Sequence, residues 1–307
     1  MEIMGFSSKW IQLVMECVRS VSYSIVVNGK ACGNITPSRG LRQGDPLSPF
    51  LFLLCAEGLS CKIRQAGEEG NLKGIAIARK SPRVSHLFFT DDCLLFCRTK
   101  SSDCLKMVAI MKDYELVSGQ VINLDKSGLI FSRNTREEDK AEVVRILNIS
   151  RILEKDKYLG LPLMIGRSKQ MEFRYIQERI WARIKGWGRR LLSKAGKAVL
   201  IQAIVQAIPL YVMNCFKLPK NLIHDIHRVV AGYWWGDENG KRKIHWKRWE
   251  GVCVSKLDGG LGFKDFESFN LAMLAKQWWR IIHSPQSLSF KVLKGRYFYY
   301  DDPMKIL

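Results

Sequence analysis

Two apolar runs on either side of adjacent aspartates stand out in the first third of the chain: Leu87-Phe88-Phe89-Thr90-Asp91-Asp92-Cys93-Leu94-Leu95-Phe96. Short apolar runs of this kind predict two strands joined by a tight turn. Because adjacent carboxylates repel each other and are costly to bury, we expect Asp91 and Asp92 at the tip of the hairpin. Such a pair suits Mg²⁺, which binds carboxylate and phosphate oxygens. Taken alone, a polar turn is the commoner explanation for two aspartates.

A second informative stretch lies about forty residues upstream and reads Arg39-Gly40-Leu41-Arg42-Gln43-Gly44-Asp45-Pro46-Leu47-Ser48-Pro49. Glycine lets the backbone approach a ligand closely, and arginine can bind phosphate through two hydrogen bonds. Pro46 suits the first turn of the helix that we expect over Leu47–Ile63. Without further context, a plain strand-to-helix turn explains the glycines equally well.

The remaining elements change in character along the chain. The first half mixes helices and strands, predicted at Trp10–Val18, Val21–Asn28, Ala31–Pro37, Leu72–Ala78, Asp103–Val117, Val121–Ser132 and 136–148. The second half is mostly helical after a short extended piece, with elements predicted at Lys157–Leu163, Ser168–Lys185, Ala195–Ala207, Leu222–Trp235 and Phe269–His283. We therefore predict an α+β protein with a domain boundary near 150–165.

The charge is distributed unevenly between the two halves. The chain carries a formal net charge of +20. Residues 1–150 contain 20 basic and 16 acidic side chains, whereas residues 151–307 contain 29 and 13. A basic half of this kind indicates a polyanionic partner such as nucleic acid, although an anionic membrane surface or mere solubility would also explain it.

The cysteines and histidines suggest neither disulfides nor a zinc site. The nine cysteines are odd in number and form no C-x-x-C pair, which indicates reduced thiols in an intracellular protein. His224 and His227 have the spacing of one helix face, and a surface face explains them more simply than a metal site. No apolar run reaches the ~18–20 residues of a membrane span, so we expect no membrane association.

Taken together, these segments resemble the reverse transcriptases of LINE-type (non-LTR) retroelements in their plant form. Residues 39–52 resemble motif B, and residues 88–92 resemble motif C with Thr90 in place of the common alanine. Residues 118–127 resemble motif D, and residues 158–162 resemble motif E, the primer grip. Further segments resemble the thumb of plant elements: Trp187, residues 192–197, Pro209-Leu210-Tyr211, Trp234-Trp235-Gly236 and residues 256–262.

The resemblance implies a fold and a reaction. Residues 1–150 would form a partial polymerase palm, a small antiparallel sheet with helices, and residues 151–307 the primer-grip strand and a basic, mostly α-helical thumb or connection region. The reaction would be RNA-directed DNA synthesis, a phosphoryl transfer with Mg²⁺ or Mn²⁺. The partners would be an RNA template, a DNA primer or duplex, and deoxynucleotides. The life cycle of such elements implies a nuclear location, and the sequence leaves the oligomeric state open.

The resemblance also assigns roles to residues. Asp91 would bind the metal, with a weaker or indirect role for Asp92, and Lys126 would be a candidate acid near the departing pyrophosphate. Three simpler explanations stay open. Lys126 could equally be a plain surface cation, and the primer-grip residues could form a plain core strand. Trp187, Trp234 and Trp235 would more simply pack in the core than stack on bases. The other implied binding residues are Arg39, Gln43 and Gly44 for the nucleotide and template, and Tyr158, Leu159 and Gly160 for the primer end.

One expected motif is not found in this sequence. In the family, motif A precedes motif B and supplies another metal-binding aspartate, whereas Met1–Phe6 resembles the helix that follows motif A. We therefore expect the fingers and motif A to be missing and this chain alone to have little or no polymerase activity. Two alternatives remain open, namely a non-catalytic module that binds nucleic acid in a salt-dependent manner and a pseudogene product without a stable fold. A weaker option is self-association through an unpaired palm edge.

Overall fold

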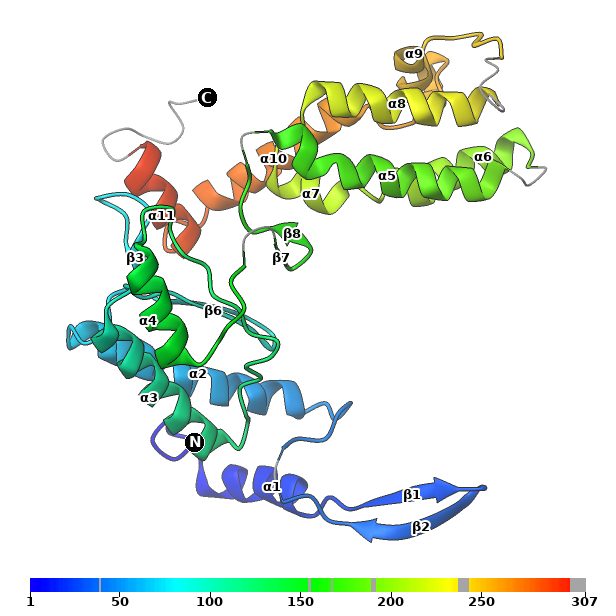
Figure 1. Ribbon diagram of the computed structural model, residues 1–307. Helices are drawn as coiled ribbons and strands as arrows, with labels where there is room; N and C mark the ends of the chain where they lie inside the picture. The colour runs from blue at the N-terminus through cyan, green and yellow to red at the C-terminus, as the bar shows by residue number, and fades with distance from the viewer. Residues whose placement is uncertain (39, 154–155, 167, 189–191, 237–242, 299–307) are drawn as a thin grey trace. The chain divides into compact units, whose positions relative to one another are not determined.

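The computed structural model describes residues 1–38, 40–153, 156–166, 168–188, 192–236 and 243–298 (Figure 1). The chain divides into two compact units, unit 1 at Met1–Leu153 and unit 2 at Glu154–Leu307. Helices and short antiparallel strand pairs make the protein α+β, as the sequence predicted. Arg39, one of the expected nucleotide-binding residues, lies outside the described residues.

Unit 1 combines helices with three strand pairs. Its elements are α1 (Ser8–Arg19), β1 (Tyr23–Val27), β2 (Lys30–Ile35), α2 (Ser48–Glu68), β3 (Ile75–Ala76), β4 (Arg83–Val84), β5 (His86–Phe89), β6 (Asp92–Leu95), α3 (Ser101–Ser118) and α4 (Glu137–Leu147).

Unit 2 is mostly helical after one short hairpin. Its elements are β7 (Lys157–Tyr158), β8 (Leu161–Pro162), α5 (Lys169–Gly188), α6 (Lys194–Leu200), the π-helix η1 (Ile201–Val205), α7 (Leu210–Cys215), α8 (Lys220–Trp235), α9 (Trp249–Cys253), the 3₁₀-helix η2 (Lys256–Asp258), α10 (Phe266–Ile282) and α11 (Leu288–Tyr297).

The strands pair only two by two. Among the described residues they form four separate antiparallel pairs, each between neighbours in sequence, and not one sheet around the aspartate hairpin. The strand or hairpin expected at Val121–Ser132 is absent from the structure, which has turns there and a single bridge between Leu129 and Ile152. Local bonds explain this difference, because Lys126 N donates to Asn123 Oδ1 and Ser127 Oγ donates to the Asn123 carbonyl. Such side-chain bonds favour a turn over a strand.

The β1–β2 hairpin forms as its turn signal predicts. Asn28 and Gly29 both have positive φ, 49° and 78°, which fits a two-residue turn between antiparallel strands. Every residue of β1 and β2 is exposed, and the ribbon extends away from the end of α1 (Figure 1). Val26 and Ile25 are 69% and 59% exposed, so this hairpin contributes little to a core.

The core of unit 1 is small. It joins α2 to α3 through six buried residues, with Phe88 and Leu95 of the β5–β6 hairpin packed against them. The α3 helix stops where the sequence predicted, because Gly119 takes the left-handed conformation that ends a helix. The six buried residues are Leu59, Ile63, Ala66, Leu72, Met107 and Ile110.

The core of unit 2 is much larger and runs through α5, η1, α7, α8, α9 and α10. Trp234 is buried within this core and Trp187 packs against it, which agrees with the simpler expectation that these tryptophans pack in the core. The helix expected at Ala195–Ala207 is present as α6 followed directly by the π-helix η1, and α7 begins after Pro209. The α11 helix was not predicted.

Two further properties of the chain bear on its class. No helix in the described segments has the length and apolar character needed to cross a bilayer. All nine cysteines are free thiols, as their spacing predicted.

Candidate catalytic hairpin

The two aspartates lie at the tip of the β5–β6 hairpin, as the sequence predicted. Phe89 pairs with Asp92, so Thr90 and Asp91 form a two-residue loop. Both carboxylates are exposed, Asp91 on the loop and Asp92 at the first position of β6. Adjacent acids are thus held on a paired backbone without the cost of burial.

Thr90 connects the shape of the loop to the Asp91 carboxylate. Its φ of 50° lies in the left-handed region, which is unusual for a β-branched residue. The Thr90 hydroxyl donates a hydrogen bond of 2.9 Å to Asp91 Oδ1. This bond is the main reason why the pKa of Asp91 is lowered, with a smaller contribution from the positive charge of Lys126. The pKa of Asp91 therefore lies below the ordinary value of an aspartate.

Lys126 lies within electrostatic range of Asp91, although the two residues are far apart in sequence. Lys126 is placed by the turn at Asn123 and not by the strand that was expected there. The two residues belong to the segments that resemble motifs C and D, and the charge of Lys126 makes a small contribution to lowering the pKa of Asp91.

The base of the hairpin is fixed to α2 by His86. Its Nε2 atom lies 3.0 Å from Ser60 Oγ of α2, and its Nδ1 atom lies 3.0 Å from Ser85 Oγ. Side chains then alternate along β5, because Phe88 packs on the core while Leu87 and Phe89 are 41% and 55% exposed. The hairpin therefore rests on α2 through one face.

A buried ion pair fixes the chain just after β6. The Asp103 side chain is 1% exposed and accepts hydrogen bonds from Arg98 Nε at 3.0 Å, Arg98 Nη2 at 2.8 Å and the Lys73 backbone N–H at 3.1 Å. Burial by itself raises the pKa of Asp103, but these bonds outweigh it and the pKa is lowered. Sequence reasoning missed both Asp103 and His86, since their partners lie in other elements.

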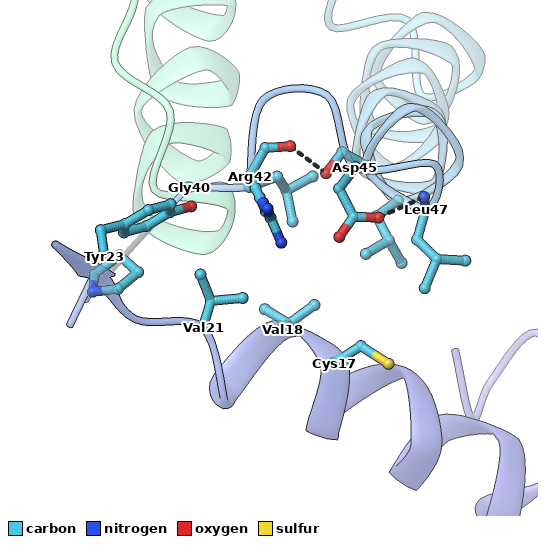
Figure 2. A pocket seen from close by; sticks show the side chains of 12 residues that line it. Cys17, Val18, Val21, Tyr23, Gly40, Arg42, Asp45 and Leu47 are labelled. Atoms are coloured by element: carbon cyan, nitrogen blue, oxygen red, sulfur yellow. Dashed lines mark hydrogen bonds between the residues drawn. The ribbon is translucent and has the colours of Figure 1, made fainter. Parts of the chain in front are cut away.

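The glycine-rich loop before α2 forms a turn closed by its own hydrogen bonds. Asp45 Oδ1 accepts from the Leu47 backbone N–H at 2.8 Å, and Ser48 Oγ donates to the Arg42 carbonyl at 2.7 Å (Figure 2). Gly40 and Gly44 both have a φ of 86°, so glycine is required for this path. Gln43 and Gly44 are exposed, where a ligand could reach them.

A pocket lies between this loop and α1. Arg42 and Asp45 lie over Cys17 and Val18 of α1 (Figure 2). The lining residues include none from the β5–β6 hairpin. The structure thus shows the loop beside α1, and the predicted roles of Gln43 and Gly44 stay predictions.

The segment that resembles the primer grip is a tight hairpin in unit 2. Tyr158 pairs with Leu161, and the loop residues Leu159 and Gly160 have φ values of 51° and 78°. Lys157 Nζ lies 3.8 Å from the centre of the Tyr175 ring, which ties this hairpin to α5. The alternative of a plain core strand does not hold, because Leu159 and Gly160 form a turn.

The chemistry of the paired carboxylates fits a divalent cation, but their number does not complete a binding site. Mg²⁺ and Mn²⁺ prefer hard oxygen ligands of the kind that Asp91 and Asp92 present. Within the part of the chain that the structure describes, no three His, Cys, Asp or Glu side chains gather into a possible metal site. The hairpin therefore offers part of a coordination shell.

Of the two histidines on α8, His227 makes a structural hydrogen bond and His224 is exposed. His224 is exposed, but His227 Nε2 accepts a hydrogen bond of 3.2 Å from the Phe266 backbone N–H at the start of α10. The expectation that both lie on a surface face is wrong for His227, because burial against α10 could not be read from spacing along one helix.

These features define an α+β protein with a paired-carboxylate hairpin in its first unit and a helical second unit. Residues 1–175 match the family described as "Reverse transcriptase (RNA-dependent DNA polymerase)". Since this match covers more than half of the chain, the protein belongs to the reverse transcriptase family.

Known relatives agree with this assignment. An uncharacterized mitochondrial protein of Arabidopsis thaliana is 45% identical over 100 residues, which are 32% of this chain and 65% of the relative. A second such protein is 43% identical over 111 residues, 34% of this chain and 86% of the relative. The Transposon TX1 149 kDa protein of Xenopus laevis is 23% identical over 270 residues, 84% of this chain but only 19% of its own length. The LINE-type resemblance predicted from the motifs is confirmed.

Proposed function

We propose that this chain is the part of an RNA-directed DNA polymerase that carries the Asp91–Asp92 hairpin, with unit 1 as palm and unit 2 as thumb. The observation that carries the proposal is the hairpin itself. Two exposed carboxylates meet at its tip, Thr90 holds Asp91, and Lys126 lies within electrostatic range. These residues all fall within the segment that matches the family.

Asp91 and Asp92 would hold a divalent cation, Mg²⁺ or Mn²⁺. When bound, such an ion stabilises negative charge on phosphate oxygens during transfer. The exposure of both carboxylates supports this role, because a cation can reach their oxygens. Lys126 would place positive charge near the departing pyrophosphate.

The remaining roles follow the family resemblance. Arg39, Gln43 and Gly44 would contact the incoming nucleotide and template base, which the exposure of Gln43 and Gly44 permits. Tyr158, Leu159 and Gly160 would position the primer end. The substrates would be an RNA template, a DNA primer and deoxynucleotides.

We expect the chain by itself to synthesise little or no DNA. Two-metal transfer needs enough ligands to hold two ions ~3.5–4 Å apart. Asp91 and Asp92 supply two carboxylates, and no third acid joins them among the described residues.

Primer extension on an RNA template, with Mg²⁺ or Mn²⁺, tests this proposal. The wild type is compared with Asp91→Ala and with Asp113→Ala, an exposed acid on α3. We expect no more product from the wild type than from Asp91→Ala. If the wild type and Asp113→Ala make product and Asp91→Ala does not, the polymerase activity is established and another carboxylate must complete the site. Product that Asp91→Ala leaves unchanged would contradict the role of the hairpin.

A second candidate function is nucleic-acid binding without catalysis. The excess of 29 basic over 13 acidic side chains in residues 151–307 favours it. It predicts an affinity for nucleic acid that falls steeply with salt and is unchanged by Asp91→Asn. An affinity that does not depend on salt would contradict it.

A further inference from the structure

Unit 2 exposes a tryptophan that its core does not use. Trp246 is 80% exposed, the highest value of any tryptophan among the described residues, whereas Trp234 and Trp249 are 7% and 9% exposed. Ile244, two residues earlier, is 68% exposed. Large apolar side chains that are left this exposed in a well-packed unit indicate a contact surface.

The exposure of Trp246 follows from fixed points on either side of it. His245 stacks on Trp235, with ring centres 5.9 Å apart and an angle of 26° between the rings. Trp249 packs on Phe263 in the core, with ring centres 5.5 Å apart. Since His245 is held by the Trp235 ring and Trp249 is buried, the chain between them is fixed at both ends and leaves Trp246 in solvent.

A second loop adjoins the first and also exposes an apolar side chain. Leu257, on η2, is 97% exposed. Backbone hydrogen bonds of 2.9 Å from Gly260 N to Ser255 O and from Gly262 N to Val254 O fix the path of this loop. Lys247 Nζ donates a hydrogen bond of 2.9 Å to the Gly259 carbonyl and so ties the two loops together.

Basic residues flank these apolar ones in the sequence. Residues 243–258 contain four basic and two acidic side chains. All four bases are exposed next to the apolar residues in sequence: Lys243 precedes Ile244, Lys247 and Arg248 follow Trp246, and Lys256 precedes Leu257. We call residues 244–248 and 255–259 the loop surface.

Resting on the nucleic-acid binding proposed above for residues 151–307, we propose that the loop surface binds single-stranded nucleic acid, with Trp246 stacked on a base and Lys247, Arg248 and Lys256 close to backbone phosphates. Aromatic stacking beside positive charge is the usual way in which proteins bind single strands without sequence preference. Every base has a face on which an exposed indole can stack, but in a duplex those faces are covered by neighbouring bases.

The observations favour a nucleic acid over a lipid surface. Proteins that lie on membranes usually insert the long apolar face of an amphipathic helix. Here the apolar contact consists of three side chains on two short loops, while positive charge follows the same path along the chain. The loop surface lies outside residues 1–175, so it adds a site to those that the family match covers.

Fluorescence anisotropy with a labelled 20-nucleotide single strand tests the proposal on the full chain. EDTA is present throughout, so the result does not depend on the metal chemistry of Asp91 and Asp92. Trp246→Ala should weaken binding at least about fivefold, the lower end of what one stacked base contributes. The matched control is Trp279→Ala, since Trp279 is 58% exposed on α10 and contacts His283. The control should bind like the wild type.

Three further arms decide the interpretation. Trp246→Ala should bind a blunt-ended duplex as the wild type does, and Lys256→Gln should reduce the salt dependence of single-strand binding by about one ion. Thermal unfolding should be unchanged in Trp246→Ala, because the side chain is exposed. The proposal would be overturned if Trp246→Ala and the wild type bound the single strand equally well. It would also be overturned if Trp246→Ala lost as much affinity for the duplex as for the single strand. Loss of binding to anionic lipid vesicles with unchanged oligonucleotide binding would show a membrane surface instead.

Discussion

The two units of this protein differ in how far they bury their own apolar surface. The main cluster of unit 2 contains 19 buried side chains, whereas that of unit 1 contains six. Unit 1 leaves Leu116 and Val117 85% exposed, together with Val26 at 69% and Phe50 at 66%. The unit that carries the candidate catalytic hairpin is therefore the less completely packed of the two. We therefore expect unit 2 to be the more stable unit, while the aspartates of unit 1 rest on a few specific contacts.

The largest effect is expected from Asn270→Leu in unit 2. Asn270 is 1% exposed, accepts from the Leu218 N–H at 2.8 Å, and donates to the Met213 and Phe216 carbonyls at 2.9 and 3.0 Å. Leucine would leave three backbone groups without partners, which should cost about 3–5 kcal/mol. Urea unfolding followed by tryptophan fluorescence reports on unit 2, since eight of the nine tryptophans lie there.

The control for this change is Asn221→Leu, an exposed asparagine on α8. It should shift the urea midpoint very little. An equal shift in both variants would mean that the hydrogen bonds of Asn270 do not hold α10 against the loop before α8.

A smaller effect is expected from Asp103→Asn in unit 1. The change removes the charge that Arg98 binds through two nitrogens. Because the Arg98 side chain is 38% exposed and can be solvated, we expect a loss of about 1–3 kcal/mol. Amide hydrogen exchange in α3 measures it. Asp113→Asn on the same helix breaks only a surface pair with Lys62 and should cost about 0.5 kcal/mol or less. Similar exchange rates in both variants would contradict the role of Asp103.

Acid should destabilise unit 2 through His227. Burial lowers the pKa of His227 despite the nearby acids Asp265 and Glu250. The folded state therefore favours the neutral ring, so this stability is present above the unfolded pKa of about 6.5 and is lost as the pH falls below it. Protonation also removes the acceptor for the Phe266 N–H, worth about 1 kcal/mol.

The measurement is the urea midpoint between pH 7 and pH 5. His227→Gln, which can accept the same hydrogen bond without titrating, should flatten the profile. His224→Gln, an exposed position on the same helix, should not. If the urea midpoint of His227→Gln depends on pH as that of the wild type does, His227 is not the cause of the acid destabilisation.

The smallest effect concerns the titration of Asp91. Thr90→Ala removes the hydrogen bond that contributes most to the lowered pKa, so the pKa of Asp91 should rise. Lys126→Ala should raise it less, and Lys112→Ala on α3 should leave it unchanged. Carboxyl NMR titration measures these shifts. A larger rise with Lys126→Ala than with Thr90→Ala would mean that the lysine, and not the hydroxyl, controls Asp91.

Local sequence patterns predicted those parts of the fold that local interactions determine. The aspartate hairpin follows from two apolar runs, the β1–β2 turn follows from Asn28-Gly29, and the end of α3 follows from Gly119. The prediction of a strand or hairpin at Val121–Ser132 was wrong, because hydrogen bonds around Asn123 outweigh the strand preference of its apolar residues.

The contacts that position the hairpin could not be predicted in the same way. His86 meets Ser60 across 26 positions, and Lys73 meets Asp103 across 30. Such pairs depend on how helices pack and not on any spacing within one element. The role of Lys126 near the departing pyrophosphate was accessible only through the family resemblance, and it stays a prediction, as do the roles of Gln43 and Tyr158.

The central claim is that the Asp91–Asp92 hairpin binds a divalent cation. Paramagnetic broadening by Mn²⁺ in the ¹⁵N-labelled chain tests it most directly, because the effect falls off steeply with distance from the ion. The account predicts that the amide signals of Phe89–Cys93 broaden first, that Mg²⁺ reverses the broadening, and that Asp91→Asn abolishes it while Asp113→Asn does not. Broadening centred elsewhere, or unchanged by Asp91→Asn, would contradict the account.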